Sequence, residues 1–371
     1  MKIYIAAIAA SVLIAWIGTR TTAYRKRKRH WVLILLSALP LILLIGLRHY
    51  SIGIDSPAYY RWFYRIRSGI EPDVFEWLYV WLNKVIGKFD VEYTAMFLAC
   101  AAIFCLPIFC RIFDDSPDII MSIFLFWAAR YYFVYFNLVR QMLSAAILLY
   151  SIRFIERKDL KRFILCVVIA AGFHSSAYAF VLLYLLADIR IEPKIIAVGT
   201  VAAAVLGRVP AVAVIVRTLS GTRYEDYAEN TGNPFAGLKF SFLVLIAVLV
   251  IALIFYKDDR RYRIYLNSQV LAVWATSMTG TVQLIERMRF TFGLPSIILL
   301  PMAVNNIKDK RAQTLVRWGV IIGFAIYGYL CLRHDPYNMM PYRLYNREHV
   351  TQIRDKLRKA EQRYSKGEEG I

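Results

Sequence analysis

Residues 31–47 read WVLILLSALPLILLIGL, a stretch without a single ionisable side chain. A membrane core about 30 Å thick needs about 20 such residues in a helix, and this stretch comes close to that length. Similar apolar runs recur through the chain, at 3–18, 92–110, 119–136, 138–152, 163–187, 195–217, 238–256, 265–285, 291–304 and 315–332. Because helices of this kind are typical of membrane proteins, the pattern predicts an all-α, polytopic integral membrane protein with about 10–11 transmembrane helices.

The composition excludes the soluble alternatives. Hydrophobic residues make up 59% of the 371 positions and charged residues 19%, whereas globular chains are about half apolar and about a quarter charged. Intrinsic disorder would need low hydrophobicity. The 46 Lys and Arg residues exceed the 26 Asp and Glu residues, giving a net charge of +20. In a membrane protein this excess indicates cytoplasmic loops and contact with the lipid bilayer's anionic head groups rather than nucleic acid.

The basic segments also predict the orientation of the chain, which we treat as one membrane domain over 1–371. Short loops rich in Lys and Arg tend to face the cytoplasm. Here these are 20–30, 153–162, 257–263 and 308–317. The outer side then receives a large loop at 48–91, the segment 218–237 and the stretch from His334, and 345–371 forms a polar C-terminal tail.

This orientation conflicts with a single span at 163–187, which would leave 257–263 outside. The conflict disappears if 163–187 enters the membrane and returns as two half-helices broken near Gly172-Phe173-His174. Such breaks occur where the backbone is buried or lines a wet cavity. We therefore expect a re-entrant helix pair; the alternative is one tilted helix.

The large loop 48–91 contains two amphipathic segments. Residues 57–67 (PAYYRWFYRIR) mix aromatic and basic side chains, and 74–86 (VFEWLYVWLNKVI) form an apolar run. Trp and Tyr prefer the membrane–water interface, so both segments are expected to be interfacial helices.

Signatures of cofactor sites are missing from the sequence. It has no Gly-rich phosphate loop and no His, Cys or carboxylate spacing suited to a metal, so we expect neither cofactor nor metal. The five cysteines are interpreted as small apolar packing residues.

Candidate site residues therefore have to be sought among polar side chains near the outer ends of the spans. An ionised group at mid-membrane costs about 2.5–3.5 kcal/mol, so such groups usually have a role. Arg48, Asp55 and Tyr59 follow the second apolar run. Arg48 could simply extend its charge to the membrane boundary. Asp55 could cap the following helix, or act as a base at the rim of an outer cavity.

A second group begins the run at 138–152. Asn137, Arg140, Gln141 and Ser144 are spaced three and four apart, so they share one helix face. This face could be an inter-helix hydrogen-bond cluster. The functional alternative makes Arg140 a bidentate clamp on phosphate oxygens.

Two further groups complete the candidates. His174 and Ser175 lie at the proposed helix break, where the histidine is either a satisfied hydrogen-bond partner or part of a wet site. In the segment Glu286-Arg287-Met288-Arg289, Glu286 and Arg289 share a face and can pair, which leaves Arg287 as the uncommitted cation.

The order of these motifs resembles the EpsG family, which belongs with the Wzy-type polysaccharide polymerases of bacterial envelopes. The resemblance rests on Arg48 with Gly53-x-Asp55-x3-Tyr59, then Asn137-x2-Arg140-Gln141, Phe173-His174-Ser175, Glu286-Arg287 and Pro341-Tyr342. It runs from about residue 30 to 345. Ile54 departs from the pattern, because the family often has a small polar residue there.

The resemblance implies a glycosyltransferase of the bacterial cytoplasmic (inner) membrane. Such a polymerase joins undecaprenyl-pyrophosphate-linked oligosaccharide repeat units at the outer face, without a metal. Asp55 and His174 would be catalytic. The substrate-binding residues would be Arg48, Tyr59, Asn137, Arg140, Gln141, Ser175, Arg287 and Arg289. A flippase and a chain-length regulator of the same pathway would be partners.

Two other classes of function remain open at this point. A transporter or flippase of lipid-linked sugars would need charged residues along a path across the membrane. A membrane acyltransferase that modifies surface polysaccharide would use His174 and would need an acidic partner for it.

Overall fold

A computed structural model describes residues 1–21, 31–73, 75–209, 240–279, 285 and 287–346. The predicted segment 218–237, Glu286, most of the basic segment 20–30 and most of the tail 345–371 lie outside these residues. The described residues are 74% helical and contain no strand. It is an all-α polytopic membrane protein, as the apolar runs predict.

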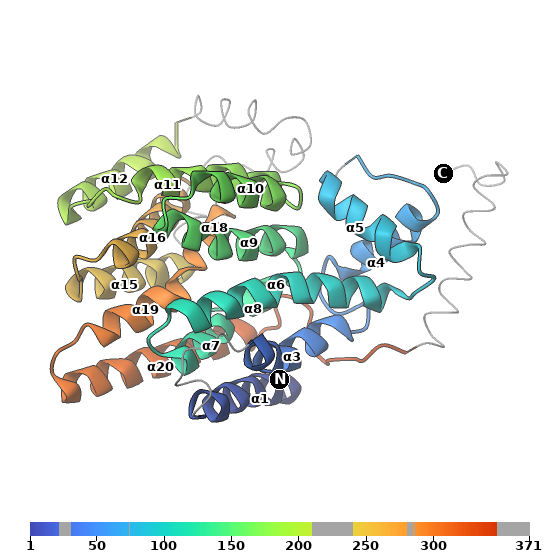
Figure 1. Cartoon of the computed structure of the whole chain (residues 1–371), viewed down its shortest axis with the longest axis horizontal. Helices are drawn as coiled ribbons and strands as arrows, with labels where there is room; N and C mark the ends of the chain where they lie inside the picture. The colour runs from blue at the N-terminus through green and yellow to red at the C-terminus, as the bar shows by residue number, and fades with distance from the viewer. Residues whose placement is uncertain (22–30, 74, 210–239, 280–284, 286, 347–371) are drawn as a thin grey trace.

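Every predicted apolar run contains a helix or part of one (Figure 1). The described helices are α1 (Lys2–Thr19), α3 (Trp31–Gly46), α4 (Ser56–Arg67), α5 (Trp77–Gly87), α6 (Tyr93–Asp115), α7 (Ile119–Ala128), α8 (Tyr131–Val134), α9 (Val139–Glu156), α10 (Leu160–Ala171), the 3-10 helix η1 (Ser175–Phe180), α11 (Val181–Leu186), α12 (Pro193–Leu206), α15 (Phe240–Ile254), α16 (Arg260–Ser277), α18 (Met288–Gly293), α19 (Ser296–Asn305) and α20 (Lys310–Leu332). The two helices expected in the large loop are therefore present as α4 and α5.

Within the described residues, four helical segments are long and apolar enough to cross a membrane unaided. Three are α1, α6 and α20, and the fourth joins α18 and α19 over Met288–Asn305. Shorter apolar helices accompany them, namely α3, α7, α12, most of α15, and η1 with α11. Several apolar runs thus contain helices shorter than the roughly 20 residues that a membrane span needs.

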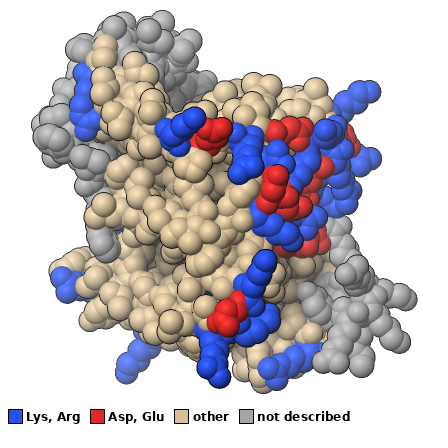
Figure 2. All heavy atoms as spheres, turned by 90° about the vertical axis from the view of Figure 1, so that its left-hand side faces the viewer, with Lys and Arg blue, Asp and Glu red and all other residues tan. Residues whose placement is uncertain are grey.

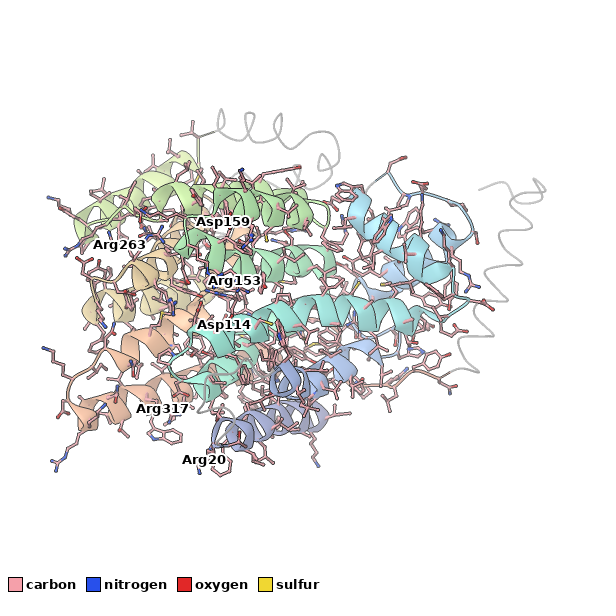
Figure 3. The ribbon with its side chains drawn as sticks, viewed as in Figure 1. Arg20, Asp114, Arg153, Asp159, Arg263 and Arg317 are labelled. Atoms are coloured by element: carbon pink, nitrogen blue, oxygen red, sulfur yellow. The ribbon has the colours of Figure 1, made fainter. Side chains whose placement is uncertain are left out.

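The helices lie side by side, so the bundle has two ends (Figure 1). One holds residues 48–73, 75–92, 129–140, 172–178, 287–290 and 334–345, and we call it the loop end. The other holds 111–118, 156–162, 188–194, 257–263 and 305–317, and we call it the charged end. Figure 2 faces the charged end and shows Lys and Arg side chains gathered with Asp and Glu. Arg20, Arg263 and Arg317 lie toward this side (Figure 3).

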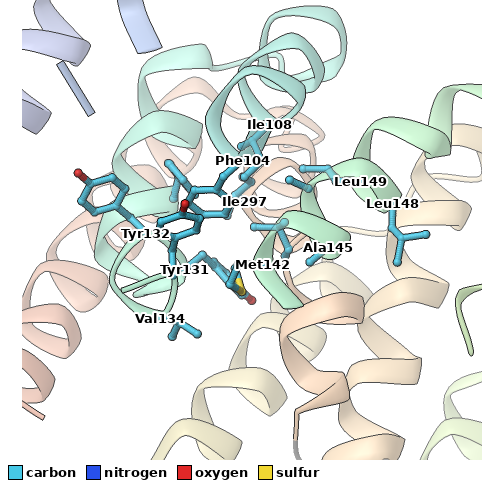
Figure 4. Close-up of a cluster of buried hydrophobic side chains, with 14 of the residues drawn as sticks. Phe104, Ile108, Tyr131, Tyr132, Val134, Met142, Ala145, Leu148, Leu149 and Ile297 are labelled. Carbon is cyan, nitrogen blue, oxygen red and sulfur yellow. The ribbon is translucent and has the colours of Figure 1, made fainter. Parts of the chain in front are cut away.

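Between the two ends the core is mostly apolar. Phe104 of α6, Tyr132 of α8, Met142 and Leu149 of α9, and Ile297 of α19 are all buried together (Figure 4). By contrast, the outer helices α1 and α20 leave large apolar side chains exposed. Apolar residues that face outward on long helices fit contact with lipid rather than water.

The chain turns back within 163–187, as predicted. α10 ends at Ala171 and η1 begins at Ser175. The rings of Phe163 and Tyr184 stack with centroids 5.0 Å apart, and Lys158 Nζ lies 3.4 Å from Asp188 Oδ2. The segment therefore begins and ends at the charged end, which confirms the helix pair; the single tilted helix is wrong.

This geometry gives the first testable expectation. Cysteines placed singly at Arg157 and Ile189, in a variant lacking the five native cysteines, should both react with a membrane-impermeant thiol reagent from the cytoplasmic side. A cysteine at exposed Asp73 in the large loop is the control for the outer side. Labelling of position 189 from outside only would contradict the helix pair.

At the loop end, the segment after α20 folds back onto the residues after α3. The His49 N–H donates to Arg343 O at 2.8 Å, and the Tyr345 N–H donates to Leu47 O at 2.9 Å. The Tyr4 hydroxyl donates to Met339 O at 2.9 Å. The beginning of the chain and the segment after its last span thus meet around the start of the large loop.

Candidate active site

The short turn before α4 is fixed by its backbone. Gly53 has φ of +99°, and a Cβ there would come within 2.5 Å of Phe136 O. The Gly53 N–H donates to Asn338 O at 2.9 Å, and the Ile54 N–H donates to Asn137 Oδ1 at 2.8 Å. Asn137 therefore holds the turn that carries the next residue, Asp55.

Asp55 occupies the N-cap position of α4, yet its side chain makes no capping hydrogen bond. The residue is exposed. Partial withdrawal from water raises the pKa of its carboxyl, and the charges of Arg287 and Arg140 act against this rise. The carboxylate is thus not used to cap the helix and is under the electrostatic influence of Arg287 and Arg140.

Arg140 has an acidic partner that the sequence reading does not identify. Its guanidinium pairs with Glu76, which precedes α5, and it lies 4.6 Å from the ring centroid of Phe75. Tyr59 is buried beside Arg140 and hydrogen-bonds to it. Glu76 Oε1 also accepts the Ser175 N–H at 3.2 Å. One glutamate therefore joins the large loop, α9 and the helix break.

The start of α5 is docked on the helix break. The N–H groups of Leu78 and Tyr79 donate to Gly172 O at 2.9 and 3.2 Å. A Cβ on Gly172 would lie 2.7 Å from the Leu78 Cβ, so only glycine permits this approach. The glycine both ends α10 and receives α5.

His174 is buried beneath exposed Ser175. Its Nδ1 accepts the Ser176 backbone N–H at 3.2 Å. A neutral imidazole with Nδ1 as acceptor carries its proton on Nε2. In this arrangement Nε2 is a hydrogen-bond donor and not a base.

The two arginines near the start of α18 diverge. Gln141 Nε2 donates to Arg287 O at 2.7 Å, and the charge of Arg287 acts on both Asp55 and His174. Arg289 instead donates from Nη1 to Ser241 Oγ of α15 at 2.7 Å. Arg287 therefore acts on Asp55 and His174, whereas Arg289 contacts α15. The pairing predicted between Glu286 and Arg289 lies outside the described residues.

Arg48 is placed differently from a side chain at the membrane boundary. Only 1% of it is exposed. Its guanidinium carbon lies 4.5 Å from the Phe97 ring centroid and 4.7 Å from that of Phe136, and Nη2 donates to Ser56 Oγ at 3.0 Å. In this structure Arg48 stabilises the turn before α4 through its hydrogen bond to Ser56. Its role in substrate binding remains a prediction.

The model of the EpsG family matches residues 31–344 of this chain. The chain belongs to the EpsG family. This is the family of Wzy-type polysaccharide polymerases, so the chain is a polysaccharide polymerase-like membrane protein. Searches of the curated proteins and of the solved structures find no match.

In this EpsG-family protein the charges around Asp55 are nearly balanced. Arg140 is offset by Glu76, whereas Arg287 acts on Asp55 itself. No group of three potential metal-ligating side chains occurs among the described residues. The groups available here are the Asp55 carboxylate, the Tyr59 hydroxyl, the His174 imidazole and the guanidinium groups of Arg140 and Arg287.

Two charged residues near the site of this EpsG-family protein are not predicted from the sequence. Glu76 sits in the otherwise apolar and aromatic segment 74–86. Arg130 lies inside the apolar run 119–136, and a charge within such a run is the signal that could have identified it. In the structure Arg130 follows α7 with φ of +73° and hydrogen-bonds to the Tyr337 hydroxyl.

The orientation of His174 leads to a second expectation. His174→Gln should keep polymer within about tenfold of the original level, because a glutamine amide can replace one neutral N–H donor. His174→Ala should lose most of it. Glycan ladders at matched protein levels measure both. Complete and equal loss in the two variants would instead indicate proton transfer by His174.

Proposed function

We propose that this EpsG-family protein is a polymerase that joins oligosaccharide repeat units carried on undecaprenyl pyrophosphate. The observation that carries the proposal is the uncapped Asp55 carboxylate, which lies within the electrostatic influence of Arg287 and Arg140. A base beside fixed cations suits the transfer of a sugar from a pyrophosphate leaving group.

The orientation we propose puts this site at the outer face of the bacterial cytoplasmic membrane. The charged end carries the basic segments 153–162, 257–263 and 308–317. By the positive-inside rule this end faces the cytoplasm, so the loop end faces outward. A flippase that delivers the lipid-linked repeats and a chain-length regulator are the partners expected for such a polymerase.

The reaction assigns one step to each group. Asp55 takes the proton from a hydroxyl of the acceptor repeat, and the resulting oxygen attacks the anomeric carbon of the donor chain. A new C–O bond forms as the bond between that carbon and the pyrophosphate oxygen breaks, and the lipid pyrophosphate leaves. Arg287 and Arg140 offset the negative charge on the leaving group. His174 and Tyr59 hold substrate oxygens by hydrogen bonds.

The two rival functions are less well supported. A transporter needs polar groups along its path, whereas the described core between the two ends is mostly apolar. Polar side chains buried there, such as Ser268 and Gln269, donate to backbone carbonyls. An acyltransferase that activates its acceptor through His174 needs a free imidazole nitrogen. Here Nδ1 is occupied by the Ser176 N–H, and Nε2 carries the proton.

The arginines provide the test of the proposed function. In cells that lack the native gene, Arg140→Lys and Arg287→Lys should each shorten the surface glycan and cause lipid-linked single repeats to accumulate, because Lys cannot copy the planar guanidinium fork. Arg61→Lys on the exposed side of α4 is the matched control. A normal ladder in both Lys variants, at normal protein level, would contradict the proposal.

A further inference from the structure

An apolar groove of about 420 Å³ runs between α15 and α20. Both helices pack on α19. From α15 the groove is lined by Val244, Ala247, Val248 and Ile251, which recur on one helix face. On the α20 side it passes Gly319 and Gly323, where a Cβ would meet nothing within 4 Å. The two glycines therefore leave open space that a side chain would otherwise fill.

The groove is about as long as one membrane leaflet is thick. It extends along α20 from Val316 to Tyr327, which at 1.5 Å per residue is roughly 17 Å. This is about half of a hydrocarbon core about 30 Å thick. The groove ends at Tyr327 on the side of the loop end, where α20 terminates at Leu332.

A smaller, mostly apolar pocket that contains two arginines continues the groove at the Tyr327 end. The two share Val244, Val248, Phe324 and Tyr327, and the pocket adds Arg130 and Arg289. Its volume of about 40 Å³ admits a few water-sized groups, which suits the terminal phosphate of a diphosphate. Among the described residues that line it there is no Asp or Glu. The surroundings of Asp55, by contrast, contain carboxylates as well as cations.

Both arginines are held at the pocket by polar neighbours. Arg130 hydrogen-bonds to the Tyr337 hydroxyl, and its guanidinium carbon lies 6.0 Å from the Tyr327 ring centroid. Arg289 donates to Ser241 Oγ at 2.7 Å. Guanidinium groups at the end of an apolar groove are complementary to an anion attached to a hydrocarbon chain.

We propose that the groove between α15 and α20 binds the chain of a prenyl diphosphate lipid, with the diphosphate at Arg130 and Arg289. The inference rests on the proposed function, because polymerisation needs two lipid-linked substrates. The groove then holds one lipid carrier on the side of α18 that Arg289 faces. Arg287, the residue before α18, instead acts on Asp55 through its charge.

Photolabelling tests the proposal without measuring polymerisation. The purified full-length protein is irradiated with a geranylgeranyl diphosphate analogue that carries a diazirine at the end of its chain, and the labelled peptides are mapped. Label is expected on α15 near Ile251 and on α20 near Val316. Unmodified geranylgeranyl diphosphate should compete, whereas geranylgeraniol and phosphatidylglycerol should compete at least about tenfold less well.

Variants separate the groove from nonspecific contact with lipid. Gly323→Phe should abolish the label by filling the groove, whereas Ala325→Phe, about 200° around the helix on an exposed face, should leave it unchanged. Arg130→Gln and Arg289→Gln should each weaken competition by geranylgeranyl diphosphate at least about tenfold. Gel filtration and circular dichroism verify that each variant is folded.

Two results would overturn the proposal. Equal competition by phosphatidylglycerol would make the groove a site for ordinary bilayer lipid, and unchanged label in folded Gly323→Phe would put the prenyl chain elsewhere. Either result leaves the proposed polymerase function standing, because that function is tested separately by the glycan ladders of the Arg140 and Arg287 variants.

Discussion

Asp55→Asn should reduce polymerisation by about 10²–10⁴-fold, the range expected when a general base is lost. The folded protein should be unaffected, because the Asp55 side chain makes no capping hydrogen bond that Asn would have to replace. Glycan ladder length and the amount of protein in the membrane measure the two effects. Near-normal chain length with Asn would exclude Asp55 as the base.

The pH dependence of polymerisation by the unsubstituted protein gives an independent check on the same residue. A base must be ionised, so activity is present above the pKa of Asp55 and falls as the pH drops through it. Because partial withdrawal from water raises the pKa of this carboxyl, the fall should occur at a higher pH than for an ordinary aspartate.

Arg111→Met should cause the largest loss of stability. Only 2% of the Arg111 side chain is exposed. It pairs with Asp115 and with Glu156 at 3.0 Å, and donates to the Tyr265 hydroxyl at 3.2 Å. Removal of this buried cation leaves the two carboxylates with only the longer pairs to half-exposed Arg261, at 3.7 and 3.4 Å. We therefore expect a cost of about 3 kcal/mol, the low end of the range for a broken buried ion pair. Thermal unfolding of the detergent-purified protein measures the change.

Arg162→Met is the matched control, because its side chain is 65% exposed and its ion pair with Asp159 is 3.5 Å long. Pairs of this kind contribute about 0–1 kcal/mol. Equal unfolding temperatures for the two variants would mean that the buried network does not hold α6, α9 and α16 together.

The membrane architecture could be predicted because apolar runs and basic loops report directly on the solvent that surrounds each helix. The parity of the basic loops also predicts the turn at Gly172, which Phe163 and Tyr184 confirm by stacking. The break after Ala128 could not be foreseen in the same way. Apolar character signals burial but not helix continuity, and here α7 and α8 are separated at Arg130, which has a positive φ.

The candidate site was only partly predictable. Local spacing brings Arg140 and Gln141 onto one helix, but their contacts depend on other segments. Glu76 reaches Arg140 from the large loop, and Arg287 presents its carbonyl to Gln141 from α18. Burial of Arg48 depends in turn on the rings of Phe97 and Phe136. Such long-range contacts follow from the packing of the bundle and leave no pattern in one sequence.

Polymerisation by the purified protein alone tests the central claim most directly. The chain is reconstituted in liposomes with a synthetic lipid-linked oligosaccharide repeat, and the products are separated by size. We expect a ladder of glycans on lipid together with released undecaprenyl pyrophosphate, and neither product with Asp55→Asn. Conversion of repeats into a ladder by Asp55→Asn, or only single repeats from the folded original protein, would contradict the account.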